Sequence, residues 1–314
     1  MRNAFLDTLF ELALHDERIV FITGDLGYRV VEKFMEQRPQ QFLNVGVAEA
    51  NMTGLAAGMS REGKIVFTYS IANFPTLRCL EQIRNDICYH DANVKIVSVG
   101  GGFAYGSLGV THHATEDLSV MRTMPNLTVV APGDPVETRA ATRAIVLHQG
   151  PCYLRLGKAG EPTVHTGPID YRLGRAIRVR NGNDLTLIST GGMLQTAVKA
   201  ADRLSAAQLH ARVVSMHTLK PLDVNEVLAA MTDTQAIFTL EEHSIVGGLG
   251  SAVAEVLAEA NGPRLPFKRL GIPSIFSPHI GKQEYLLAQH GLNDEGVTRT
   301  ILATLKPSSS RQNT

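Results

Sequence analysis

The chain has 314 residues, of which 44% are hydrophobic, and its 30 basic and 30 acidic side chains give a formal net charge of zero. A balanced charge without a concentrated basic run offers no electrostatic reason to bind nucleic acid or an anionic membrane. At roughly 100–200 residues per domain the sequence predicts two domains, with small molecules and other proteins as partners.

The cysteines and the N-terminal residues indicate the compartment. Cys79, Cys88 and Cys152 are odd in number and contain no Cys-x-x-Cys pair, which argues against a disulfide framework and a zinc site. They are expected to be buried thiols in a reducing compartment, and no metal ligand is assigned to this chain. The first residues lack the apolar core of a signal peptide, and no run approaches the roughly 18 apolar residues of a membrane span. The expected location is the cytoplasm.

Short β-branched runs alternate with longer helical patterns, which is typical of mostly parallel sheets covered by helices on both faces. An apolar stripe over residues 4–14 predicts a helix, and residues 19–23 predict the first buried strand. Further strands are expected at 42–46, 64–69, 94–99, 127–131 and 152–156. Helices are expected near 48–61, 75–90, 115–123 and 134–148.

The pattern breaks after Leu156 into a turn-rich stretch that predicts a domain linker. A second α/β series follows, with strands near 184–189, 211–216, 235–240 and 266–270 and a helix at 251–260 that opens with the glycine run 247–250. The predicted fold class is therefore α/β with two doubly wound domains. The expected boundaries are a first domain at 1–160, a linker at 161–172, a second domain at 173–306 and a tail at 307–314.

Glu49 lies where the apolar run at 42–47 passes into a helical pattern. Such strand-to-helix junctions are where α/β enzymes tend to place catalytic groups. The alternative is a glutamate that simply opens a helix, favoured by the helix dipole by up to about 1 kcal/mol. This segment alone does not separate the two interpretations.

Four segments of the first half resemble, in order and spacing, the pyrimidine-binding domain of the transketolase family of thiamine-diphosphate enzymes; they are residues 42–52, 69–75, 109–113 and 124–132. Residues 217–223 and 241–251 resemble that family's C-terminal domain. The resemblance runs from about Arg2 to Leu305. It implies a pyrimidine-binding (thiamine-diphosphate) domain followed by a transketolase C-terminal domain.

The resemblance implies that thiamine diphosphate is the cofactor and assigns its pyrimidine end to this chain. Glu49 would be the carboxyl group that hydrogen-bonds to the pyrimidine N1′. This contact drives the pyrimidine into the tautomer that is needed for deprotonation at the thiazolium C2. A partly desolvated carboxyl suits this task. Phe74 would stack on the ring, unless it is an ordinary core residue. Ile71 takes the place of a second ring-contacting Phe. Asp25 corresponds to an aspartate near the thiazolium, with a turn aspartate as the alternative.

The resemblance also implies substrate contacts. His112 matches the histidine of a Gly-Pro-Thr-His signature beside the reacting carbons, where an imidazole can hydrogen-bond or transfer protons near pH 7. His113 is the alternative in the same role. Lys158 lies where relatives place an arginine for the terminal phosphate of the substrate, and Arg155 could share that duty. A solvated linker lysine is the alternative for Lys158.

Several positions depart from the family pattern. Leu108 replaces an aspartate that reads a sugar hydroxyl in transketolases and 1-deoxyxylulose-5-phosphate synthases. In transketolases the stretch that corresponds to residues 100–107 carries another substrate-facing histidine, which this loop lacks. The glycines of the loop suggest close backbone approach. Tyr105 and Ser107 are candidates for new substrate contacts. These departures leave the donor and acceptor sugars open.

Two arginines on the helix predicted at 75–90 are explained without a functional role. Arg78 and Arg84 lie on either side of Glu81, so pairing on the helix surface accounts for both.

No Gly-Asp-Gly sequence occurs in the chain. In this family that motif belongs to a diphosphate-binding domain, whose oxygens hold Mg²⁺ against the diphosphate. The resemblance therefore implies the C-terminal subunit of a split transketolase, with Mg²⁺ held mainly by an N-terminal partner subunit. The expected assembly is a heterotetramer of two copies of each chain.

The expected activity is transfer of a two-carbon ketol unit from a ketose phosphate, or a related anionic sugar, to an aldose. One alternative is the β subunit of a 2-oxoacid dehydrogenase decarboxylase component, which shares the fold and the glutamate; residues 111–112 and 124–127 favour the ketol transferase. The other alternative is a non-catalytic scaffold subunit. The joint presence of Glu49, Phe74 and His112 argues against it.

Overall fold

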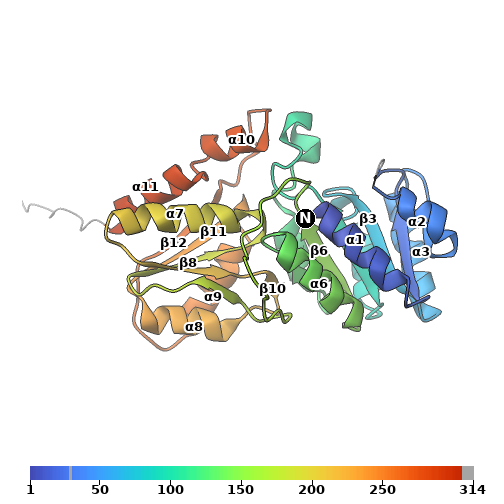
Figure 1. Cartoon of the computed structure of the whole chain (residues 1–314), viewed down its shortest axis with the longest axis horizontal. Helices are drawn as coiled ribbons and strands as arrows, with labels where there is room; N and C mark the ends of the chain where they lie inside the picture. Colours follow the sequence, from blue (N-terminus) through green and yellow to red (C-terminus); the bar gives the residue numbers. More distant parts are fainter. Residues whose placement is uncertain (28–29, 306–314) are drawn as a thin grey trace, which may run out of the picture.

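The computed structural model describes residues 1–27 and 30–305, and Figure 1 shows two α/β domains side by side along the longest axis. The first contains a seven-stranded sheet of order β10-β5-β6-β4-β3-β1-β2, and the second a five-stranded sheet of order β12-β11-β8-β9-β7. The predicted fold class is confirmed. The predicted tail at 307–314 lies outside the described residues.

The elements of the first domain follow the predicted order. Its parallel strands are β1 (Ile19–Thr23), β2 (Phe42–Asn44), β3 (Ile65–Ile71), β4 (Val94–Val99), β5 (Thr128–Val130) and β6 (Cys152–Leu156). Its helices are α1 (Arg2–Ala13), α2 (Glu32–Gln37), α3 (Glu49–Arg61), α4 (Leu80–Gln82), α5 (Asp117–Thr123) and α6 (Pro135–Leu147). The helix predicted at 75–90 is instead a 3₁₀ turn (Leu77–Cys79), the single turn of α4, and a π-helix (Ile83–Cys88). Helix α2 was not predicted.

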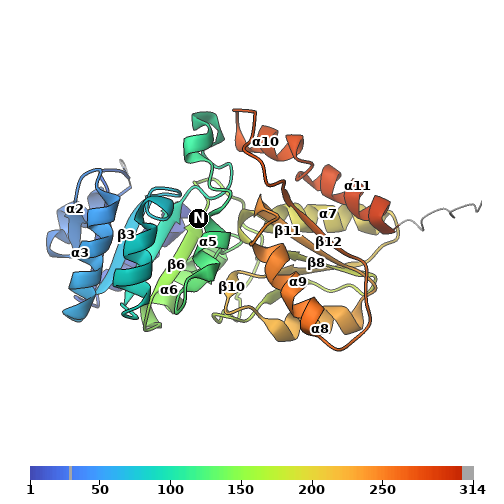
Figure 2. The same ribbon diagram turned by 180° about the vertical axis from the view of Figure 1, so that it is seen from behind.

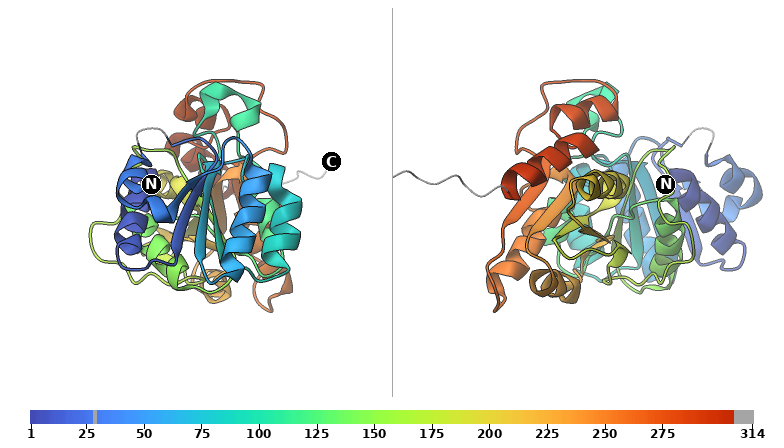
Figure 3. Two further views of the ribbon diagram at one scale, coloured as in Figure 1. Left: turned by 90° about the vertical axis from the view of Figure 1, so that its right-hand side faces the viewer. Right: turned by 60° about the vertical axis from the view of Figure 1, so that its left-hand side comes forward.

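The side chains of β1 point alternately to the two faces of this sheet, which explains why helices cover both faces. Ile19 and Phe21 pack with α1 and α6, whereas Val20 and Ile22 pack with α3 and α5 on the other side. Successive side chains of a strand point to opposite faces, so an all-apolar strand needs helices on both. The end-on view of Figure 3 (left) shows this sheet between its two helical layers, and Figure 2 shows the α3 and α5 side.

The second domain is a smaller sandwich of the same kind. Its strands are β7 (Ile177–Arg180), β8 (Leu185–Ser189), β9 (Ala211–Ser215), β11 (Ile237–Ser244) and β12 (Phe267–Ile272), all parallel except β7. Its helices are α7 (Leu194–Ala206), α8 (Val224–Asp233), α9 (Leu249–Glu259), α10 (Gln283–Gln289) and α11 (Asp294–Leu305). Helices α7 and α11 cover one face, and α8 and α9 cover the other (Figure 1).

One strand crosses the predicted domain boundary. β10 (Thr218–Lys220) comes from the second half of the chain, yet it pairs antiparallel with β5 at the edge of the first sheet. The main-chain N–H of Ala131 also donates to the carbonyl of His217 at 2.8 Å. This pairing was not predicted, because three residues are too short for a recognisable pattern. It covers an otherwise open strand edge and ties the two domains together.

Two further predictions concern burial and the membrane. Cys79, Cys88 and Cys152 are buried and unpaired, as expected. Within residues 1–27 and 30–305, the structure has no helix with the length and apolar character needed to cross a bilayer.

Candidate active site

The first-domain candidates gather at the carboxyl edge of the sheet, where ligands of parallel α/β proteins bind. Glu49 is the first residue of α3, and β2 reaches it through Gly46, whose φ of 73° is a conformation that glycine readily adopts. The predicted strand-to-helix junction is therefore confirmed. Asp25 follows β1, is exposed, and accepts a hydrogen bond from the side-chain amide of Asn44 at 3.0 Å. Ile71 ends β3 and is half-buried.

The Glu49 side chain is only 1% exposed, and both of its carboxylate oxygens are engaged. The Ser70 hydroxyl on β3 donates to Oε1 at 3.1 Å, and Nη1 of Arg78 donates to Oε2 at 2.8 Å. A buried carboxylate requires such partners, because desolvation disfavours its charged form. Sequence reasoning missed Ser70, although a serine in the apolar strand β3 was a visible signal.

The prediction that Arg78 pairs on the surface near Glu81 is wrong. Arg78 crosses to Glu49, and Arg84 donates to the side-chain oxygen of Asn85 at 2.8 Å. The 3₁₀ turn, α4 and the π-helix do not keep the regular spacing on which pairing along an α-helix depends. The guanidinium carbon of Arg78 also lies 4.7 Å from the centre of the Phe74 ring.

Phe74 is half-buried, so one part of its ring remains accessible. His112 lies against it in an edge-on arrangement with a centroid separation of 5.2 Å. The side-chain amide of Asn73 donates to the carbonyl of His113 at 2.6 Å and holds the two turns together. The structure thus brings Glu49, Phe74 and His112 into one group.

The two adjacent histidines have different environments. His112 is half-buried, and its Nδ1 lies 3.0 Å from the Thr111 hydroxyl. Partial burial, with a smaller effect of His113, lowers the pKa of His112, so its imidazole is neutral near pH 7. His113 is buried, with Nε2 3.2 Å from the Gly106 carbonyl and its ring against Phe103. Of the two, His112 is the more exposed.

The loop at 100–107 makes close backbone contacts, as its glycines suggested. A Cβ at Gly101 would lie 2.6 Å from the Arg155 side chain, and one at Gly102 would lie 2.4 Å from the Glu242 carboxyl group. The main-chain N–H of Phe103 donates to Glu242 Oε1 at 2.7 Å. The glycines therefore let the loop approach charged side chains of its own chain.

Lys158 contacts Tyr105 of this loop, with the lysine Nζ 4.9 Å from the centre of the tyrosine ring. Tyr105 is 6.5 Å from His112, ring centre to ring centre, while Ser107 is exposed. Lys158 also lines a cavity of about 310 Å³ at the junction of the two domains. Neither Glu49 nor Phe74 lines this cavity.

Arg155 also lines this cavity, but most of its contacts lie within the chain. Its side chain is 5% exposed and pairs with Asp117, which is fully buried, at 2.8 Å. Its Nη2 donates to the carbonyls of Ala114 at 2.8 Å and of Glu242 at 3.0 Å. These hydrogen bonds hold the Nε and Nη2 side of Arg155 in an ion pair within the chain.

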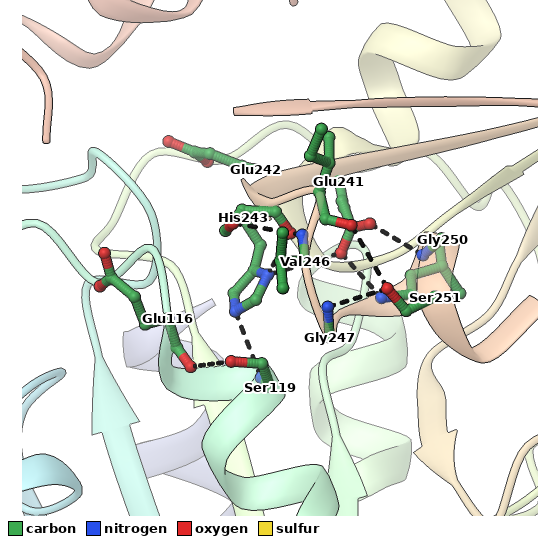
Figure 4. A network of polar contacts seen from close by, with 12 residues as sticks. Glu116, Ser119, Glu241, Glu242, His243, Val246, Gly247, Gly250 and Ser251 are labelled. Carbon is green, nitrogen blue, oxygen red and sulfur yellow. Dashed lines mark hydrogen bonds and ion pairs between the residues drawn. The ribbon is translucent and has the colours of Figure 1, made fainter. Parts of the chain in front are cut away.

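Figure 4 shows a second buried polar network, where α5 of the first domain meets the start of α9. Glu241 accepts hydrogen bonds from the main-chain N–H groups of Leu249 and Gly250 at 2.7 and 2.8 Å. Burial raises the pKa of Glu241 to about 7. His243 Nε2 accepts from the main-chain N–H of Ser119 at 3.3 Å. The network therefore joins the domains through polar groups.

The glycine run at 247–250 allows close packing at this contact between the domains. A Cβ at Gly247 would lie 2.5 Å from the Cβ of Ser119, and one at Gly248 would lie 2.1 Å from the Glu241 carboxyl group. Side chains at these positions would force the network apart.

Comparison with known proteins assigns the family. Residues 1–161 match the model of the transketolase pyrimidine binding domain, and residues 174–297 match that of the transketolase C-terminal domain. The chain therefore belongs to the transketolase family, and within it to the transferase subunits of transketolases divided between two chains.

Individual relatives have similar length. The chain is 39% identical to an apulose-4-phosphate transketolase subunit of Phocaeicola vulgatus, over 97% of each chain. It is 38% identical to the 6-deoxy-6-sulfo-D-fructose transketolase subunit SqwH of a Clostridium species, over 95% of this chain and 92% of the relative. A solved structure described as a split gene transketolase, inactive beta4 tetramer, matches with a TM-score of 0.88 and 38% identity over 97% of each chain.

Proposed function

We propose that this chain binds the pyrimidine end of thiamine diphosphate and, with an N-terminal partner subunit, transfers a two-carbon ketol unit from a ketose phosphate or related anionic sugar to an aldose. The observation that carries the proposal is the buried Glu49 carboxylate beside the half-buried Phe74 ring, at the carboxyl edge of the sheet. A buried acid next to an aromatic face fits the pyrimidine end of this cofactor. When bound, thiamine diphosphate supplies a carbon nucleophile that attacks the ketose carbonyl.

Each residue of the group has a task in this proposal. Glu49 holds a proton at its contact with N1′, while Ser70 fixes the other carboxylate oxygen. Phe74 stacks on the ring, and Ile71 and Asp25 border the cofactor at the ends of their strands. The neutral His112 hydrogen-bonds to oxygens on the reacting carbons.

The diphosphate end belongs to the partner in this proposal. Among residues 1–27 and 30–305, no group of three or more His, Cys, Asp or Glu side chains is arranged to hold a metal ion. We assign Mg²⁺ to the N-terminal subunit, and we propose an assembly of two copies of each subunit. The buried, unpaired thiols support a reducing, cytoplasmic location.

Reconstitution tests the proposed function. The chain is co-purified with a candidate partner that contains a Gly-Asp-Gly motif, and ketol transfer is measured with thiamine diphosphate, Mg²⁺ and a panel of sugars that includes apulose 4-phosphate and 6-deoxy-6-sulfo-D-fructose. Activity is expected only when both subunits are present. Decarboxylation of a 2-oxoacid would move the function to the dehydrogenase β subunit. Stable assembly without cofactor binding would favour the scaffold.

We propose Lys158 as the anchor of the anionic end of the substrate, with Tyr105 and Ser107 as neighbouring hydroxyl contacts. Lys158→Ala should raise KM for phosphorylated or sulfonated sugars about tenfold and leave kcat nearly unchanged, because a contact remote from the reacting carbons contributes equally to ground-state and transition-state binding. Steady-state kinetics on charged and uncharged donors measures the effect. Lys268→Ala, at an exposed position on β12, is the matched control. Equal effects on both kinds of donor would contradict an anion anchor.

A further inference from the structure

Arg78 makes both of the contacts that the proposed function assigns to the pyrimidine ring. Its Nη1 donates to Glu49 Oε2 at 2.8 Å, and its guanidinium carbon lies 4.7 Å from the centre of the Phe74 ring. Nothing in the proposed chemistry uses this arginine.

A guanidinium group and an aminopyrimidine ring share the features that let either one contact Glu49 and Phe74. A guanidinium is flat, carries N–H donors in its plane and stacks on aromatic faces. A protonated aminopyrimidine is also flat and presents an N–H donor at its edge. Both groups therefore match a carboxylate beside an aromatic face.

The two contacts of Glu49 come from different sides. Ser70 holds Oε1 from within the sheet, whereas Oε2 faces the partly exposed Arg78 side chain. Arg78 already donates to that oxygen. A ring that hydrogen-bonds to Oε2 and stacks on Phe74 has to take the place of the guanidinium.

Arg78 is also free to leave. Its side chain is 48% exposed although its partner Glu49 is 1% exposed, so it reaches the buried carboxylate from the solvent side. Rotation about its side-chain bonds carries the guanidinium into water without moving the 3₁₀ turn (Leu77–Cys79) on which it lies.

We propose that Arg78 is an internal occupant of the pyrimidine pocket, which the cofactor displaces when it binds. This inference rests on the proposed function. In the subunit without cofactor, Arg78 neutralises the buried Glu49 and covers the Phe74 ring. Because only the fraction of molecules with Arg78 displaced can bind, the arginine lowers the apparent affinity for thiamine diphosphate.

The test measures the dissociation constant of thiamine diphosphate by calorimetry on the reconstituted complex with Mg²⁺. Arg78→Ala should tighten binding about tenfold, as expected if roughly a tenth of wild-type molecules are open. Arg84→Ala is the matched control, because Arg84 lies on the same segment and donates to Asn85; its affinity should equal that of the wild type. Unchanged or weaker binding by Arg78→Ala would overturn the proposal, and weaker binding would make Arg78 a residue that positions Glu49.

Two further variants keep the test decisive. Arg78→Lys retains the charge without the planar fork, should bind with intermediate affinity, and carries the test if Arg78→Ala does not assemble. In a Glu49→Gln background, Arg78→Ala should change the affinity less than about twofold, since the charge that holds the arginine is gone. If Arg78→Ala still tightened cofactor binding about tenfold in the Glu49→Gln background, Arg78 would act through a contact other than Glu49. That result would overturn the proposal.

The two proposals fail separately. If Glu49→Gln is inactive but Arg78→Ala does not tighten cofactor binding, only the occupant role of Arg78 fails. If Glu49→Gln retains normal turnover, the assignment of Glu49 fails with the proposed function.

Discussion

Glu49→Gln should abolish ketol transfer by the reconstituted complex while leaving its assembly intact. An amide keeps the shape of the buried side chain but cannot share a proton with N1′, so the loss should be at least about 10²–10⁴-fold in kcat, the range of general acid–base catalysis. Turnover is measured with the sugar pair identified by reconstitution, and assembly is measured by size-exclusion chromatography.

The control for this experiment is Glu81→Gln, an exposed glutamate two residues after the turn that carries Arg78. It should turn over like the wild type. A Glu49→Gln complex that assembles and works at a near-normal rate would remove Glu49 from the mechanism.

Arg155→Met should cost about 3–5 kcal/mol of unfolding free energy, the usual loss when one partner of a buried ion pair is removed. The substitution leaves the fully buried Asp117 without its cation and removes the donor to the carbonyls of Ala114 and Glu242. Since domains are stable by only about 5–15 kcal/mol, this loss is large. Urea unfolding of the isolated subunit measures it.

Arg143→Ala is the matched control for Arg155→Met. Arg143 pairs with Glu11 at 3.0 Å, and both side chains are more than half exposed, so removing this pair should cost less than about 1 kcal/mol. A cost for Arg155→Met as small as that of the control would show that the Asp117 pair adds little to stability.

The sequence predicted the central strands of the first sheet best. The predicted ends of β4 (Val94–Val99) and β6 (Cys152–Leu156) coincide with those observed, because these strands are buried throughout and a glycine follows each of them. The predicted strand at 42–46 ends two residues early, at Asn44, ahead of the positive-φ Gly46. Helix α2 and strands β7 and β10 were missed, because short elements at sheet edges and in connections carry weak periodicity.

Prediction of the candidate site residues depended on family resemblance and not on the periodicity of apolar residues. Glu49, Phe74 and His112 were found through family resemblance, and the fold brings them together. Arg78 was misassigned, because residue spacing reports neighbours along a helix and not a contact with a residue 29 positions away.

The ion pair of Arg155 with Asp117 also had a signal in the sequence. It is a cation inside the otherwise largely apolar strand β6 (Cys152–Leu156). A buried charge is costly unless it is paired or hydrogen-bonded, and Asp117 at the start of α5 supplies the partner of Arg155.

The pairing of β10 with β5 has a consequence for how the active site closes. Domains linked by a single flexible segment can rotate about it and shut over a substrate. Here such a rotation would pull a strand out of the first sheet and break the Arg155 and His243 contacts across the junction. We therefore expect the Glu49 edge and the cavity beside Lys158 to move together as one rigid body. On the proposed function, water would then be excluded by loops or by the surface of the partner subunit, and not by bending within this chain.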